Sequence, residues 1–262
     1  MQVSETMQAF LDTAPEWLLN APKWINDFGY QFFKSFIHEN RWMQYTEGLG
    51  NTLLLTFFAL ILGLVLGIII SLIRVSWDTM HDEMRPGPGK FFLGIGNVIS
   101  KIYLTVIRGT PVVVQIMIIF FVIMASSNNK ILAGVIAFGV YSGAYVAEII
   151  RGGIMSIDNG QFEAGRSLGF NYVQTMWYIV LPQVIKNVLP ALLNEFIALL
   201  KETSVAGYVA VQDLTKGGDI IRGRTYSAFM PLLAVALIYL ALVTFFSWIV
   251  GKVERRLRNS ER

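Results

Sequence analysis

Long apolar runs separated by short polar stretches dominate the chain from residue 48 onward. An α-helix needs about 20 mostly apolar residues to cross the hydrocarbon core of a bilayer, and five runs are close to that length. Charged side chains occur only in the third run, at Glu148, and in the fourth, between Glu195 and Glu202. The pattern predicts an all-α, polytopic membrane helical bundle with spans at residues 52–73, 109–129, 131–150, 187–205 and 228–250.

The second span has two possible starts. Phe91–Ile107 is apolar apart from Lys101, and the charge-free run Gly109–Asn129 follows it. Pro111 has no backbone N–H and Gly109 relaxes the chain, so we expect a kink or break between the two stretches. We take 109–129 as the span, and a start near Phe91 stays open.

Small residues indicate where helices pack closely. Gly63 and Gly67 form a G-x-x-x-G pattern in the first span, which allows close approach of a second helix. The third span carries small residues on several faces, which predicts a central place in the bundle. After the fourth span, a polar stretch from Val205 to Tyr226 contains K216-G-G-D219, predicted as a turn.

Composition agrees with a membrane protein and excludes several other classes. Hydrophobic residues make up 54% of the 262 residues, charged residues make up 15%, and the mean hydropathy is +0.54. The absence of cysteine excludes disulfides, thiolate metal sites and cysteine nucleophiles. The net charge of +3 gives no nucleic-acid footprint. We expect no catalytic residue set, no metal site and no cofactor bound by this chain.

The N-terminal segment, residues 1–47, is rich in aromatic side chains. Glu5 and Asp12 stand where a cleavable signal would be basic, so we do not expect one. The density of aromatic residues is typical of an interfacial, extracytoplasmic helix with rings at headgroup level. A lead-in packed on the outer face of the bundle explains the pattern equally well. The tryptophans of this segment are Trp17, Trp24 and Trp42.

The stretch Gln161–Pro182, between the third and fourth spans, reads E-A-G-x-x-x-G-x(9)-I-x-L-P from Glu163. Good helix formers run from Gln161 to Leu168, and Gly169 is well placed as the left-handed residue that ends the helix. Ala164 and Gly165 have almost no side chain, so another backbone can approach there. The sequence predicts a short docking helix with Glu163 and Arg166 on one face.

This stretch resembles the EAA loop of the membrane subunits of ATP-binding cassette importers, in which a short cytoplasmic helix sits in a groove on the ATPase subunit. R-G-T-P-V-V-V-Q from Arg108 and the segment Tyr141–Ile154 resemble the polar amino acid branch. The resemblance covers residues 48–250, a type 1 transmembrane domain. It implies that coupling to the ATPase rests on five residues: Glu163, Ala164, Gly165, Arg166 and Gly169.

The same resemblance implies a set of partners. A type I importer has a second permease copy or homologue, two ATPase subunits that bind ATP and Mg²⁺, an extracytoplasmic solute-binding protein and a polar amino acid as substrate. The chain has no G-x-x-x-x-G-K-[ST] sequence, so ATP hydrolysis is expected on a partner. The implied location is the bacterial inner membrane.

Five spans place the chain ends on opposite sides of the membrane. The tail, residues 251–262, is basic, which argues for a cytoplasmic C-terminus and an outside N-terminus. The loop at 161–182 then lies inside, where an ATPase is found. The basic residues of the tail are Lys252, Arg255, Arg256, Arg258 and Arg262.

Glu195 is the leading candidate for the substrate pathway. A carboxylate at that depth costs at least ~2.5 kcal/mol unless it is paired or hydrated, so such residues usually face a bundle interior or an aqueous route. Asn194 extends the polar stripe. An ion pair between Glu195 and a basic residue of a neighbouring helix remains open as a purely structural role.

Other pathway candidates lie near the predicted break and in the third span. Amides freed around Thr110, beside Gln115, are candidate donors to a substrate carboxylate. Tyr141 and Glu148 share one face, and a plain Glu148–Arg151 ion pair with tyrosine packing is the alternative role. The rival function is an ion-gradient-driven secondary transporter using membrane carboxylates. It predicts an internal repeat of spans, which the sequence lacks.

Overall fold

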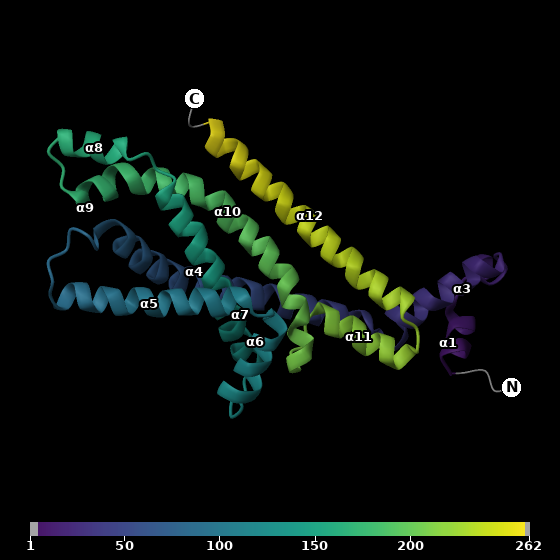
Figure 1. The fold of residues 1–262 in the computed structure, drawn as a ribbon. Coiled ribbons are helices and arrows are strands. Elements are labelled where there is room, and N and C mark those ends of the chain that lie inside the picture. The colour runs from purple at the N-terminus through teal and green to yellow at the C-terminus, as the bar shows by residue number, and fades with distance from the viewer. Residues whose placement is uncertain (1–4, 260–262) are drawn as a thin grey trace. The chain divides into compact units, whose positions relative to one another are not determined.

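The computed structural model describes residues 5–259, and within that range every regular element is a helix. Five helices are long and apolar enough to cross a membrane, which confirms the predicted all-α bundle and its span count. Figure 1 shows their order along the chain. They are α4 (Trp42–Met80), α5 (Pro88–Gly109), α7 (Lys130–Met155), the run Tyr172–Val209 that contains α10 (Leu181–Glu202), and α12 (Phe229–Asn259).

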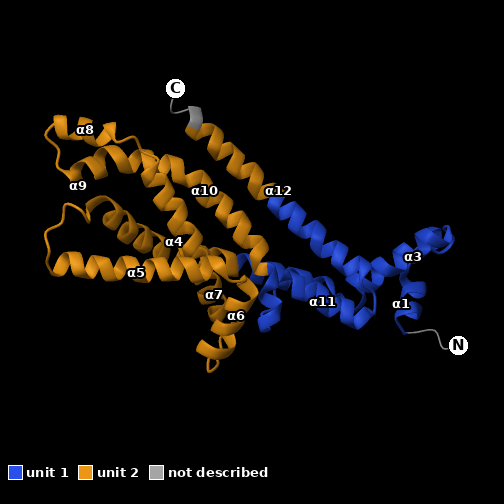
Figure 2. Ribbon diagram, in the orientation of Figure 1, with its two compact units in different colours: residues 1–54, 204–243 blue, residues 55–203, 244–262 orange. Residues whose placement is uncertain are grey.

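The chain divides into two compact units. One holds the N-terminal part up to Leu54 together with Ser204–Val243, and the other holds Leu55–Thr203 and the chain from Thr244 on (Figure 2). Residues 260–262 of the basic tail, including Arg262, lie outside the described residues.

In the second unit, α7 is the central helix, as predicted. Of its most apolar stretch 56% is buried inside the protein, against 17–28% for the other four spans. The G-x-x-x-G pattern of α4 lies against it, since a Cβ at Gly63 would lie 3.1 Å from Ser142 Cβ and one at Gly67 would lie 2.7 Å from Val146 Cβ. Glycine therefore lets the two backbones approach closely.

The predicted bounds of the second span, 109–129, are wrong. The membrane-length helix is α5, which ends at Gly109, and the following run holds only α6 (Val112–Ile118) and the π-helix η3 (Ile119–Ile123). The break itself occurs at Gly109–Pro111, as expected. The predicted span starts too late because Lys101 interrupts the apolar run of α5. The Lys101 side chain is exposed on this helix, so its charge is not buried inside the protein.

The fourth span starts earlier than the predicted residue 187. A helical turn α9 (Tyr172–Thr175) and the π-helix η4 (Met176–Val180) lead directly into α10. Pro182 lies in the first turn of α10, directly after the π-helix, where the hydrogen-bonding pattern of the helical run already changes. The second half of the stretch 161–182 is therefore the beginning of the fourth span and not a loop.

The first two long helices form a hairpin within the second unit. Arg74 donates to Asn97 Oδ1 of α5 at 2.5 Å and lies 3.6 Å from the Asp78 carboxylate. Further along α4, Trp77 and His81 stack with ring centroids 5.0 Å apart. The end of this hairpin thus carries polar contacts.

In the first unit, α11 (Leu214–Thr225) replaces the predicted turn at Lys216–Asp219. The fully buried Asp213 caps the start of α11. Its carboxylate accepts hydrogen bonds from the N–H groups of Thr215 and Lys216 at 3.0 Å each. The glycines that suggested a turn instead allow close packing. A Cβ at Gly217 would lie 2.5 Å from the Gln44 carbonyl oxygen.

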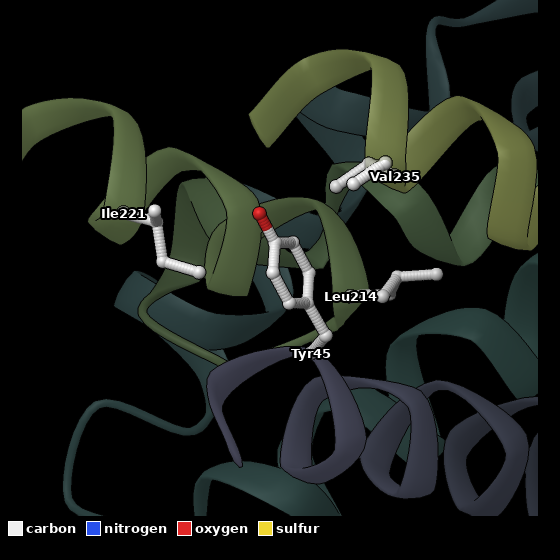
Figure 3. Close-up of a cluster of buried hydrophobic side chains, with 5 residues drawn as sticks. Tyr45, Leu214, Ile221 and Val235 are labelled. Atoms are coloured by element: carbon white, nitrogen blue, oxygen red, sulfur yellow. The ribbon is translucent and has the colours of Figure 1, made fainter. Parts of the chain in front are cut away.

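Apolar side chains complete this packing. Tyr45 of α4 lies among Leu214, Ile221 and Val235, the last from α12 (Figure 3). The N-terminal helices of the same unit are α1 (Glu5–Thr13), α2 (Glu16–Leu19), α3 (Lys23–Phe32), the π-helix η1 (Phe33–Ile37) and the 3₁₀ turn η2 (His38–Asn40).

Candidate functional site

The predicted docking helix is present as α8 (Gly160–Ser167). Gly169 follows it with φ of 81°, which confirms the left-handed stop. The Phe170 N–H donates to the Gly165 carbonyl at 3.0 Å, and the Gly169 N–H donates to the Arg166 carbonyl at 2.9 Å. These two bonds form a Schellman motif, so the helix has a fixed end.

The faces of α8 differ in what they contact. Glu163, Ala164 and Arg166 are exposed, whereas Gly165 is buried against Thr175 of α9. A Cβ at Gly165 would lie 2.6 Å from Thr175 Cγ2. The close approach expected at Gly165 is thus made by the chain's own α9, whose Thr175 fills that space.

Three contacts hold α8 on the start of the fourth span. Phe162 stacks on Tyr172 with centroids 5.7 Å apart and an interplanar angle of 11°. Gln183 donates to Gln161 Oε1 at 3.2 Å, and Thr175 packs under Gly165. Any displacement of α8 therefore acts directly on the helix that carries Glu195.

Three large apolar side chains that follow α8 in the sequence are exposed, and they were not predicted. Leu168, Val173 and Trp177 are all exposed. Their signal in the sequence is the presence of bulky apolar residues in an otherwise polar connector. Exposed apolar side chains beside exposed charges are typical of a protein interface.

Glu195 lies between α10 and α7. It accepts a hydrogen bond from Ser142 Oγ at 2.9 Å, and among the described residues it makes no ion pair. The predicted alternative of a basic partner is thus not found in that range. Tyr141, next to Ser142, interacts electrostatically with Glu195 and also with Glu202, which lies about two turns further along α10. The group forms a short polar strip between the two helices.

Glu148 has basic partners on two sides. Its carboxylate lies 3.3 Å from Arg151, the pair considered in the sequence, and 3.4 Å from Arg108 at the end of α5. The Arg108 guanidinium also lies 5.8 Å from the centroid of Tyr145, which packs on Tyr141 at 5.0 Å. Arg108 is the residue that sequence reasoning missed, although it directly precedes the predicted break.

Asn194 does not join this group of residues. Asn194 Nδ2 donates to the Pro190 carbonyl at 3.0 Å and to Glu254 of α12 at 3.4 Å. Neighbouring residues on a helix point about 100° apart, so Asn194 faces away from Glu195 and does not extend its stripe.

Gln115 and Thr110 complete the break between α5 and α6. Gln115 Nε2 lies 2.7 Å from the Ile107 carbonyl and 2.9 Å from the Thr110 carbonyl, and Thr110 Oγ donates to Val106 at 2.8 Å. The donors of the buried Gln115 side chain are thus used on carbonyls left free where α5 ends. The amide N–H groups are therefore occupied, whereas the buried Oε1 of Gln115 has no hydrogen-bond partner within the described residues.

The chain resembles known transport proteins over most of its length. Residues 89–259 match the family model described as binding-protein-dependent transport system inner membrane component. The arginine transport system permease protein ArtQ of Bacillus subtilis is 37% identical over 82% of this chain and 93% of that protein. The glutamine transport system permease protein GlnP of Escherichia coli K12 is 34% identical over 81% of this chain and 92% of its own length.

Solved structures give the same result. A crystal structure of an amino acid ABC transporter with histidines matches with a TM-score of 0.71 and 39% identity, over 81% of this chain and 94% of that chain. An inward-facing structure of the MetNI methionine ABC transporter matches with a TM-score of 0.68 at 19% identity, which supports the fold. The chain therefore belongs to the family of binding-protein-dependent transport system inner membrane components.

Proposed function

We propose that this chain is the permease subunit of an ATP-driven importer of polar amino acids, in the inner membrane of a bacterium, and that α8 docks on a separate ATPase subunit. The observation that carries the proposal is the geometry of α8. It is a capped helix with Glu163, Ala164 and Arg166 exposed, fixed to the span that bears Glu195. The names of the homologous arginine and glutamine permeases support the substrate class.

The proposed topology rests on the spans and the basic tail. Five helices of membrane-spanning length support an arrangement with α8 and the C-terminus on one side of the membrane and the N-terminus on the other. Lys252, Arg255 and Arg256 favour the inside for the tail. The ATPase then docks from the cytoplasm, and an extracytoplasmic binding protein delivers the solute to the opposite face. A second permease copy or homologue completes the path.

The polar strip between α7 and α10 suits an amino acid. Glu195 offers an anionic contact for the ammonium group, with Ser142 and Tyr141 beside it. For the carboxylate, Arg108 joins the backbone amides freed around Thr110 as a candidate partner. Its side chain is 46% exposed, and a guanidinium has donors beyond those that Glu148 accepts. The two contacts lie one to two turns apart along α7.

Energy enters through differential affinity. ATP must bind one conformation of the ATPase pair more tightly than the other, since a ligand without such a preference shifts no equilibrium. Docked α8 helices then move with the ATPase subunits, and the contacts with Tyr172, Thr175 and Gln183 pass this movement to α10. The rival secondary-transport mechanism gives α8 no role.

Charge reversal on α8 tests the docking. Glu163→Arg is expected to abolish co-purification of the ATPase subunit, because the exposed side chain belongs to the proposed interface. Glu83→Arg is the matched control, as it reverses an exposed carboxylate in the loop predicted to lie on the same side. ATPase retained by both variants, or lost from both, would contradict the proposal.

Removing the charge at Glu195 tests the pathway separately. We expect Glu195→Gln to lower amino acid uptake in proteoliposomes by about tenfold or more, a loss of roughly 1.4 kcal/mol in binding the ammonium group. The ATPase should still co-purify, and basal hydrolysis should be retained. Uptake and substrate-stimulated hydrolysis at the original rates would remove Glu195 from the pathway.

A further inference from the structure

The N-terminal helices carry a stripe of exposed aromatic side chains. Trp24, Phe28 and Phe32 recur every four residues on α3, so they project from one side of that helix. Trp24 is 72% exposed, and Trp17 of the preceding helix is 69% exposed. Soluble surfaces rarely show so much contiguous aromatic area, which marks a contact with another apolar body.

An apolar groove opens beside this stripe. It has a volume of about 450 Å³, and its walls include Trp17, Phe28 and Phe32 of the stripe. Behind them lie Phe10, Leu18, Ile25 and Phe33. The stripe and the groove therefore face the same medium, and that medium must solvate hydrocarbon over the whole of this face.

The segment is firmly attached to the beginning of the first span. Phe36 stacks on Tyr45 with centroids 5.1 Å apart, and the buried Arg41 donates to the Lys34 carbonyl at 2.8 Å and to Glu39 at 2.7 Å. Ser227 Oγ donates to Gln31 at 2.8 Å. All of these contacts lie inside the first unit. They fix the position of the stripe along the axis of α4.

Exposed apolar side chains also follow the stripe in sequence into the first span. Ile37, Trp42 and Met43 are exposed between α3 and the second turn of α4, and Leu54 is exposed further along. A bare apolar side of a membrane span faces lipid. Because the N-terminal helices pack on the start of this span, the stripe lies close to the same lipid.

Charge does not explain the attachment. Between Glu5 and Asn40 the chain has five acidic residues and two lysines, so the segment has no attraction for anionic headgroups. The aromatic rings are the groups suited to the interface, where amphipathic side chains prefer to lie. The contact should therefore depend on a bilayer and be insensitive to its charge.

We propose that residues 5–43 form an interfacial anchor, in which the stripe of Trp17, Trp24, Phe28 and Phe32 enters the headgroup region of the bilayer beside the first span. Of the two roles that the sequence left open for this segment, the anchor is the one that leaves these rings uncovered by protein. The partner is the lipid surface itself.

The natural absence of cysteine makes a direct test simple. Spin labels are attached to Trp24→Cys and Phe28→Cys in full-length protein, reconstituted with its ATPase into uncharged lipid nanodiscs. Lys23→Cys is the matched control, since it is exposed on the other side of the same helix. We expect the ratio of oxygen to nickel-chelate accessibility to be several-fold higher at residues 24 and 28 than at residue 23.

Two results would overturn the proposal. Equal access of the chelate to residues 23 and 24 would place the stripe in water. A label at residue 24 that neither relaxing agent reaches would place it under another protein.

A second measurement guards against damage by the labels. In unlabelled protein, lipids brominated near the headgroup should quench part of the tryptophan fluorescence, and the Trp17→Phe/Trp24→Phe variant should lose the share that comes from these two rings while Trp42 is still quenched. The quenching should be unchanged at high salt. Equal quenched intensity in both proteins would also refute the anchor.

Discussion

The two connecting helices, α8 and α11, look alike in sequence and differ in what covers them. Both are short, polar and glycine-containing. Only Gly165 is buried among the eight residues of α8, whereas five of the twelve residues of α11 are buried. α8 thus keeps its polar face free for a partner, while the fold of the first unit encloses α11. Composition alone does not separate a docking helix from a structural one.

Their glycines show the physical origin of the difference. Gly217 of α11 lies against the backbone carbonyl of Gln44, which cannot move without disturbing α4. Gly165 of α8 lies against the side chain of Thr175, and no backbone atom is among its nearest neighbours. The same residue type therefore serves packing against a backbone in one helix and packing against a side chain in the other.

The largest effect should come from Gly217→Ala. Its Cβ would lie 2.5 Å from the Gln44 oxygen, so we expect a loss of about 1–3 kcal/mol in the free energy of unfolding. Thermal unfolding in detergent measures it. Gly223→Ala in the same helix is the control, because its Cβ would meet nothing within 4 Å and should be neutral or slightly stabilising. Equal melting temperatures for the two variants would contradict this account of α11.

The helix caps give the next largest contrast. Asp213→Ala removes the acceptor for two N–H groups of α11 and should cost about 1 kcal/mol. Asn159→Ala at the start of α8 should cost much less, because Asn159 makes no side-chain capping bond. Comparable losses in the two variants would show that the caps do not distinguish the helices.

Asp213 also gives the enclosed helix a pH response. Burial raises the pKa of Asp213 above its ordinary value of 3.8, so the folded state binds a proton more tightly than the unfolded state does. Its effect on stability is therefore most favourable below pH 3.8 and declines as the pH rises through the raised folded pKa. Asp213→Asn keeps the cap and should remove this decline. A melting temperature that depends on pH identically in both proteins would refute it.

Gly165→Ala should have the smallest effect, about 1 kcal/mol at the low end of the cost of overpacking, because the otherwise unburied α8 can shift away from Thr175. Thr175→Ala should restore the loss in the double variant, since it removes the side chain that the new methyl meets. Melting temperature and ATPase co-purification are the two readouts. A loss that Thr175→Ala leaves unchanged would mean that Gly165 acts through some other contact.

Most of the fold followed from elementary patterns in the sequence. Uninterrupted apolar runs gave four of the spans within longer helices, and the left-handed stop at Gly169 followed from glycine's freedom at positive φ. The second span was misplaced because Lys101 was counted against α5. A lysine near a helix surface keeps its charge in a polar environment while its methylenes contact lipid.

The candidate site was only partly predictable. Glu195 was found because a carboxylate in a membrane span is costly, but its partner Ser142 lies 53 residues away and leaves no periodic signal. Arg108 was missed for the same reason, as its contact with Glu148 depends on how α5 and α7 cross. The contact between Gly165 and Thr175 could not be foreseen either, because no sequence pattern pairs the two residues.

The length of α4 has a consequence for what lies outside the lipid. Thirty-nine residues make a rod of about 58 Å, nearly twice the roughly 30 Å of hydrocarbon it has to cross. Even a strong tilt leaves turns of α4 outside the hydrocarbon. This helix therefore reaches into the headgroup region or into water at one of its ends or at both.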